Sequence, residues 1–193
     1  MPDGDRYHPR LTDRFPDGVR SRIEEFDDAI DRLFDTVRGH PVIDRMFYSA
    51  SALGDFAAIW HLLSWAPVSR SSAQRRAATE VSMSLAVESV LVNGLIKSLF
   101  KRSRPVQDGP RPHHLRQPRT SSFPSGHASA AMVAATMLGR ERRWGWLFYI
   151  PALIVASSRI HVRIHHASDV AGGLVTGLLL GRALKWLWSD RRR

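Results

Sequence analysis

Hydrophobic and polar residues are segregated into long blocks along this chain of 193 residues. Apolar stretches run over residues 46–66, 79–100, 127–138, 144–157 and 170–188. The first, second and fifth approach the roughly 20 residues that a helix needs to cross a bilayer. The third and fourth are shorter, so they need flanking residues to span and could instead be buried helices of a soluble protein. The pattern predicts an all-α fold, an integral membrane bundle with about five transmembrane helices.

An amphipathic helix is predicted over residues 18–40, ahead of the apolar stretches. Its apolar residues follow helical spacing on one face and are Ile23, Phe26, Ile30, Leu33, Phe34 and Val37. Such a helix packs on the rest of the protein or lies in the membrane interface. The expected organisation is a flexible polar arm over 1–17, an amphipathic interfacial helix over 18–40 and a membrane-embedded domain over 41–193.

Glycine positions in the last apolar stretch add to the membrane interpretation. Gly173, Gly177 and Gly181 repeat at every fourth residue, a spacing that lets helices approach closely in lipid. In a soluble helix each glycine would cost about 1 kcal/mol relative to alanine. The glycine stripe could serve packing within the chain or a homo-oligomer.

Composition and charge narrow the choice of partners. The chain carries 28 Lys and Arg against 18 Asp and Glu, a formal net charge of +10. A chain this basic needs an anionic partner, which is nucleic acid, acidic lipid or a phosphorylated substrate. The absence of cysteine excludes disulfides, thiolate metal sites and a cysteine nucleophile. The polar N-terminus has no apolar run, so we expect no cleavable signal peptide.

Two polar clusters interrupt the apolar pattern at stretch ends. Lys97, Lys101 and Arg104 share a helical face at the end of the second stretch, where they form an anion site or are cations that snorkel to the membrane edge. The run 124–127, Pro-Ser-Gly-His, stands where the third stretch begins. Free backbone amides at a helix start are a ready anion site, although the run could simply be a capped helix start.

A third cluster links the fourth and fifth stretches. It contains Ser158, Arg159, His165 and Asp169, with the aspartate four residues after the histidine. A carboxylate at that distance can fix the tautomer of a neutral imidazole and leave its other nitrogen as nucleophile or base. The alternative is a helix cap next to a surface histidine. All three clusters fall on the same predicted membrane face, so we expect them to form one site.

Together the clusters resemble the signature of the type 2 phosphatidic acid phosphatase family, which shares its site with bacterial acid phosphatases and vanadium haloperoxidases. The fixed positions of that signature are matched by Lys97, Arg104, Pro105, Pro124, Ser125, Gly126, His127, Ser158, Arg159, His165 and Asp169. The resemblance implies a phosphohistidine mechanism without metal or cofactor. His165 would attack phosphorus, Asp169 would orient it, and His127 would act first as acid and then as base. By the same resemblance the phosphate-binding residues are Lys97, Arg104, Ser125, Gly126 and Arg159.

Other polar residues are predicted to have lesser roles. Asp55, Glu88 and Asn93 fall inside predicted spans, where they form interhelical hydrogen bonds or line a polar cavity. The residues expected to be loop hydroxyls, or loop and headgroup contacts, are Thr120, Ser121, Ser122, His161 and His166.

The leading interpretation is a membrane-embedded phosphatase that hydrolyses the phosphomonoester or diphosphate of a lipid. The resemblance suggests polyprenyl phosphates, phosphatidic acid or phosphatidylglycerophosphate as substrates. The alternatives are a soluble acid phosphatase, a haloperoxidase that holds vanadate, and a non-enzymatic basic protein that binds membranes or nucleic acid. Because the last class does not need the histidines and Asp169 at these spacings, we expect a lipid phosphate and the bilayer as partners, and no nucleic acid. Short basic loops on the opposite side predict a plasma-membrane protein with an extracytoplasmic site.

Overall fold

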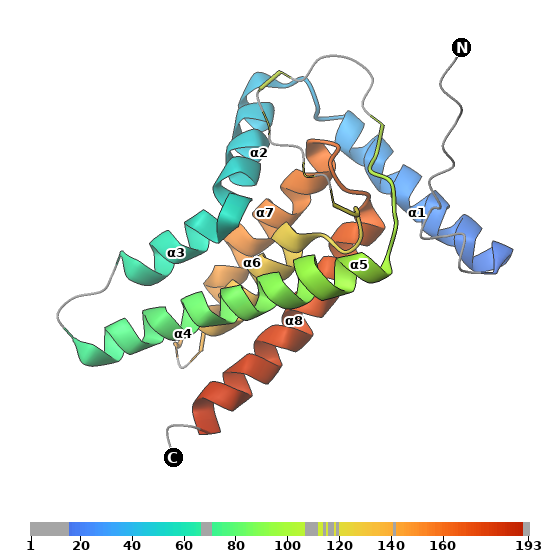
Figure 1. The fold of residues 1–193 in the computed structure, drawn as a ribbon. Helices are drawn as coiled ribbons and strands as arrows, with labels where there is room; N and C mark the ends of the chain where they lie inside the picture. Colours follow the sequence, from blue (N-terminus) through green and yellow to red (C-terminus); the bar gives the residue numbers. More distant parts are fainter. Residues whose placement is uncertain are drawn as a thin grey trace, which may run out of the picture.

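The computed structural model of the protein describes residues 16–66, 71–106, 112–113, 115, 118, 120–140 and 142–190. All regular elements in these ranges are helical, which confirms the all-α expectation (Figure 1). The elements are α1 (Asp17–Asp35), α2 (Pro41–Gly54), η2 (Asp55–Ala57), α3 (Ala58–Trp65), α4 (Ser72–Glu88), η3 (Ser89–Ile96), α5 (Lys97–Leu99), α6 (Gly126–Leu138), η4 (Gly145–Phe148), α7 (Tyr149–His161) and α8 (Ala167–Asp190).

Each predicted apolar stretch folds as helix, but the first is not continuous. A sharp kink at η2 divides it into α2 and α3, because Phe56 and Ala57 adopt left-handed backbone angles with φ of 53° and 57°. Within the described residues, two helices are long and apolar enough to cross a membrane. These are the continuous helix Ser72–Leu99, which contains the π-helical segment η3, and α8. The expected number of five spans is therefore not confirmed.

Helix α6 is the centre of the bundle and packs between α8, α7 and α4 (Figure 1). Every residue from Ala128 to Leu138 is buried, so this short helix is enclosed on all sides. The glycine stripe of α8 faces it closely: a Cβ atom added at Gly173 would lie 2.5 Å from the carbonyl oxygen of Ser125. The stripe thus serves packing within the chain, and a homo-oligomer stays a prediction.

Large apolar side chains remain exposed on the outer sides of several helices. They include Leu62, Val90, Leu95, Leu99, Ile150, Leu153, Val175, Leu179 and Trp186. Exposed apolar surface on this scale marks contact with a partner or a membrane. Its distribution around the bundle is what a lipid-facing surface requires.

Helix α1 lies across one end of the bundle and divides its apolar residues between two environments (Figure 1). Ile30 and Phe34 pack against a buried cluster formed by α6, α7 and α8. Val19, Phe26 and Leu33, spaced seven residues apart, are exposed. Part of α1 thus packs on the rest of the protein, and its location in the membrane interface stays a prediction. The polar arm falls almost wholly outside the described residues.

Candidate active site

The three polar clusters meet at one end of α6. The chain reverses direction from helix to helix, so the end of the helix Ser72–Leu99, the start of α6, the end of α7 and the start of α8 come together. The backbone amide of Ser125, the residue that caps the start of α6, donates to the carbonyl oxygen of Asp169 in the first turn of α8 at 3.0 Å. Clusters separated by more than forty residues are therefore joined directly.

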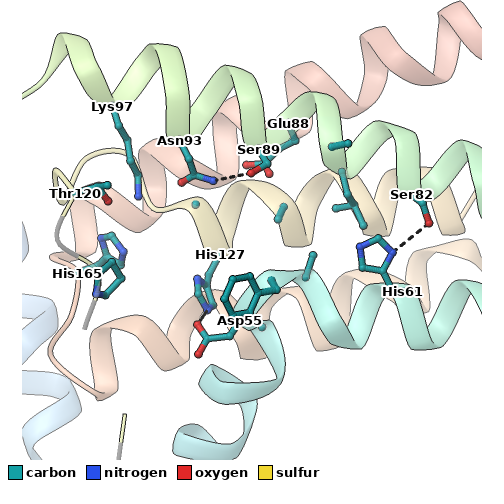
Figure 2. Close-up of a pocket in the computed structure, with 18 residues that line it drawn as sticks. Asp55, His61, Ser82, Glu88, Ser89, Asn93, Lys97, Thr120, His127 and His165 are labelled. Atoms are coloured by element: carbon teal, nitrogen blue, oxygen red, sulfur yellow. Dashed lines mark hydrogen bonds and ion pairs between the residues drawn. The ribbon is translucent and has the colours of Figure 1, made fainter. Parts of the chain in front are cut away.

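A cavity of about 490 Å³ opens at this end of the bundle. Of the predicted site residues, Lys97, Gly126, His127 and His165 line it, and Figure 2 shows the side chains of Lys97, His127 and His165 around one space. The other four predicted residues do not line it and are Arg104, Ser125, Arg159 and Asp169. All three of the polar residues noted inside predicted spans, Asp55, Glu88 and Asn93, line the cavity as well.

The two ring nitrogens of His165 face different groups. On one side, Nδ1 lies 3.3 Å from the hydroxyl of Ser122 and 3.6 Å from Oδ2 of Asp169. On the other side, Nε2 lies 3.3 Å from Nη1 of Arg104. Because the carboxylate side binds Nδ1, the free lone pair belongs on Nε2, next to a guanidinium that can hold an anion.

His165 is buried and neutral. Burial lowers the pKa of its imidazole to about 3, and the positive charges of Arg159 and Arg104 lower this pKa as well. The hydrogen bond with Asp169 acts in the opposite direction and raises it. A neutral imidazole keeps the lone pair that nucleophilic attack requires.

Asp169 is fully buried and held from several directions. Its Oδ2 accepts hydrogen bonds from the Ser122 hydroxyl at 2.6 Å and the His166 amide at 2.9 Å. Its Oδ1 accepts from Nη1 of Arg102 at 2.5 Å, and the other arm of that guanidinium binds Asp27 of α1 at 2.6 Å. Helix α1 is thus connected to the cluster around His165 through a buried chain of charges, Asp27 to Arg102 to Asp169.

Two of the predicted phosphate-binding residues, Ser125 and Arg104, have buried polar atoms without a hydrogen-bond partner among the described residues. The Ser125 hydroxyl is fully buried and has no hydrogen-bond partner among the described residues, and neither does Nε of Arg104. Buried polar groups are normally satisfied, so these two atoms are available as donors to an anion. The orphan hydroxyl stands at the start of α6, where backbone amides already favour an anion.

His127 is held by the opposite wall of the site. Its Nε2 lies 3.1 Å from Oδ1 of Asp55 and 3.2 Å from the carbonyl oxygen of Ser51. The hydroxyl of Ser51 in turn accepts a hydrogen bond from Arg159 of α7. This wall is formed by α2 and the kink η2, which none of the three sequence clusters includes.

Several contacts of the site could not be found from the sequence. Ser122 is a buried bridge between His165 and Asp169, so the expectation of an ordinary loop hydroxyl is wrong for it. His161 is not a headgroup contact, since it is buried against Asp44. His166 lies with Nδ1 3.2 Å from Asp169. Asp55, Glu88 and Asn93 had given a signal, as costly polar residues inside apolar stretches.

The chain belongs to the PAP2 superfamily, whose sequence model matches residues 77–193. Undecaprenyl-diphosphatase BcrC of Bacillus subtilis is 31% identical over 96 residues, which cover 49% of this chain and 50% of that protein. Decaprenylphosphoryl-5-phosphoribose phosphatase of Mycobacterium tuberculosis is 35% identical over 103 residues, 51% of this chain and 55% of that protein. The chain therefore matches about half the length of each of these curated relatives.

The fold is also similar to that of a solved structure. The transmembrane PAP2 type phosphatidylglycerolphosphate phosphatase from Bacillus subtilis superposes with a TM-score of 0.66 over 91% of this chain and 88% of that one. At 22% sequence identity, this similarity is evidence for the fold alone. The superposed part extends to residues before position 77, because it covers 91% of the chain and the family model matches residues 77–193 alone.

Proposed function

We propose that this chain is a membrane-embedded phosphatase that removes phosphate from a lipid phosphate or diphosphate through a phosphohistidine intermediate. The observation that carries the proposal is the arrangement around His165, whose Nδ1 faces Ser122 and Asp169 while its Nε2 faces Arg104. That arrangement offers a neutral, oriented nucleophile beside a fixed cation. His127 and Lys97 line the same cavity.

The reaction proceeds in two displacements. Nε2 of His165 attacks phosphorus, the phosphorus–oxygen bond of the ester breaks, and His127 gives a proton to the departing oxygen. Water then attacks the phosphohistidine while His127 takes up a proton, the phosphorus–nitrogen bond breaks, and phosphate is released. Phosphoryl transfer depends mainly on positioning and charge stabilisation, which Lys97, Arg104 and the helix start at Ser125 provide.

The substrate class is supported by the shape of the cavity and by the relatives. Its apolar lining, which includes Phe56, Ala57, Leu85, Ala86 and Ala130, continues from the charged end along α4 and α6 (Figure 2). A lipid can therefore place its phosphate among the cations while its first apolar carbons remain in the groove. The two curated relatives are named for polyprenyl substrates, so a polyprenyl phosphate or diphosphate is the leading candidate.

The site faces the extracytoplasmic side of the plasma membrane on this proposal. Short loops rich in arginine are retained in the cytoplasm. Arg140, Arg142 and Arg143 follow the end of α6, and Arg75 and Arg76 stand in the first turn of α4, both away from the site. Accessibility of an N-terminal tag in intact cells tests this orientation, and a cytoplasmic tag would contradict it.

The decisive experiment is phosphate release from a panel of lipid phosphates by detergent-purified protein. The panel contains a polyprenyl phosphate, a polyprenyl diphosphate, phosphatidic acid and phosphatidylglycerophosphate. We expect turnover in EDTA, because the side chains themselves supply the positive charge, inhibition by vanadate, and near-complete loss in His165→Ala. Turnover that requires an added metal, or full activity in His165→Ala, would contradict the proposal.

A further inference from the structure

We propose that Asp55 is the residue that positions His127 for proton transfer to the leaving group. The inference rests on the proposed function and adds a residue to it. Asp55 lies before residue 77, outside the part of the chain that the PAP2 family model matches.

The contact is direct. Oδ1 of Asp55 lies 3.1 Å from Nε2 of His127, and Figure 2 shows the carboxylate next to the imidazole on the cavity wall. A carboxylate at this nitrogen retains the proton on Nε2 and leaves Nδ1 as the nitrogen that exchanges a proton with the substrate. It also stabilises the imidazolium form, which is the form that a general acid needs before it donates.

The backbone around Asp55 is shaped for this contact. Phe56 and Ala57 adopt left-handed φ angles of 53° and 57°, which are strained for residues other than glycine. Gly54 precedes them, and a Cβ atom there would lie 2.6 Å from Cδ2 of His127. The kink thus holds strain and a required glycine at the place where α2 meets the imidazole. Strain of this kind clusters at functional sites.

Other charged groups around His127 have different partners. Arg159, from α7, binds the hydroxyl of Ser51. Glu88 and Lys97 stand across the cavity on the helix Ser72–Leu99, and Glu88 accepts a hydrogen bond from Ser129. His165 lines the charged end of the cavity. Among the described residues, Asp55 is the carboxylate in contact with the imidazole of His127.

The chain offers a matched control in a second Asp–His pair, whose aspartate lies in α2, the helix that directly precedes η2. Oδ1 of Asp44 lies 2.8 Å from Nε2 of His161, and both side chains are buried. Neither residue lines the cavity. Loss of the Asp44 carboxylate therefore reports what the removal of a structural pair does to the protein.

The test compares kcat/KM for two soluble phosphate esters, an alkyl phosphate with a poor leaving group and 4-nitrophenyl phosphate with a good one. The value of kcat/KM reports the steps up to phosphorus–oxygen cleavage. In these steps only the poor leaving group needs a proton. We expect Asp55→Asn to lower kcat/KM for the alkyl ester roughly 100-fold and that for the aryl ester less than about 3-fold. When His127 is already replaced by alanine, Asp55→Asn should lower kcat/KM no further, because Asp55 acts through His127.

The controls separate this inference from the proposed function. Asp44→Asn should leave the alkyl-to-aryl ratio of kcat/KM unchanged, and Asp55→Glu, which retains a carboxylate, should keep it near the wild-type value even if Asp55→Asn is poorly folded. Equal losses on both esters in Asp55→Asn, or an altered ratio in Asp44→Asn, would overturn the assignment of Asp55. Absence of wild-type activity on the panel of lipid phosphates would instead overturn the proposed function.

Discussion

The two histidines of the site are held in very different ways. His165 stands in a loop between α7 and α8 and is surrounded by buried charges and hydroxyls, with Ser122, Asp169 and Arg104 on its two sides. His127 stands in the first turn of α6 and meets a single carboxylate at a strained kink. Most groups around His165 belong to the family-matched part of the chain, whereas the wall against His127 precedes it.

This difference indicates how the family's chemistry and its specificity can be separated. On the proposed mechanism, the groups that form and stabilise a phosphohistidine are needed for every substrate. The groups that hold the acid and line the apolar groove depend on the leaving group, so they can differ between relatives that share the same motifs. The comparison predicts that substitutions near His165 reduce turnover of all substrates alike, while substitutions at the kink discriminate between substrates.

The largest effect after loss of His165 itself is expected for Asp169→Asn. The amide leaves the imidazole in place but removes the charge that fixes its tautomer and stabilises the positive charge formed during attack. We expect kcat to fall roughly 10³-fold, by the same physics as in other carboxylate-oriented histidines. Turnover of the alkyl and aryl esters should fall by a similar factor, and a wild-type rate would remove Asp169 from the site.

The next largest loss of activity is expected for Ser122→Ala. The hydroxyl donates to Asp169 at 2.6 Å in a fully buried place, and hydrogen bonds to charged groups contribute about 1.5–3 kcal/mol. We therefore expect a loss in kcat of roughly 10- to 100-fold. Ser121→Ala, at the neighbouring and less buried hydroxyl, is the matched control and should stay within about 3-fold of wild type.

A smaller effect is expected for Asp27→Asn on α1. Asp27 binds Arg102 at 2.6 Å and also accepts from the amide of Ser168 at 2.7 Å, so it holds the guanidinium that contacts Asp169. We expect a loss of roughly 10-fold in kcat together with a lower melting temperature, because a buried ion pair is left half-formed. Asp28→Asn changes an exposed neighbour and should alter neither quantity. Equal kcat and equal melting temperature in the two variants would show that α1 does not support the site.

The smallest effect concerns stability in acid. The pKa of His165 is lowered by burial to about 3 in the folded protein, whereas an exposed histidine has a pKa of about 6.5. As the pH falls from the unfolded value toward the folded one, the unfolded chain takes up a proton that the folded chain does not, so stability decreases. The melting temperature of His165→Asn, followed over this range, should fall less steeply than that of wild type. Identical slopes would contradict a buried neutral His165.

The sequence predicted the helices well because helical periodicity and apolar length are local properties. All five apolar stretches fold as helix, and three distant clusters meet because the helices alternate in direction. The kink at η2 was not predicted, since Phe56 and Ala57 give no local signal for left-handed backbone. The link between Asp27 and Arg102 spans 75 positions and that between Ser122 and Asp169 spans 47, so both depend on tertiary packing.

The most direct test of the account is to trap the covalent intermediate. Protein quenched in base during turnover of a lipid or aryl phosphate labelled at phosphorus should carry the label on His165, as phosphohistidine that is stable in base and lost in acid. The label should be absent in His165→Ala and should accumulate when His127 is replaced by alanine and the aryl ester is used. Label on another residue, or turnover of a phosphate chiral at phosphorus with inversion of configuration, would contradict the double displacement at His165.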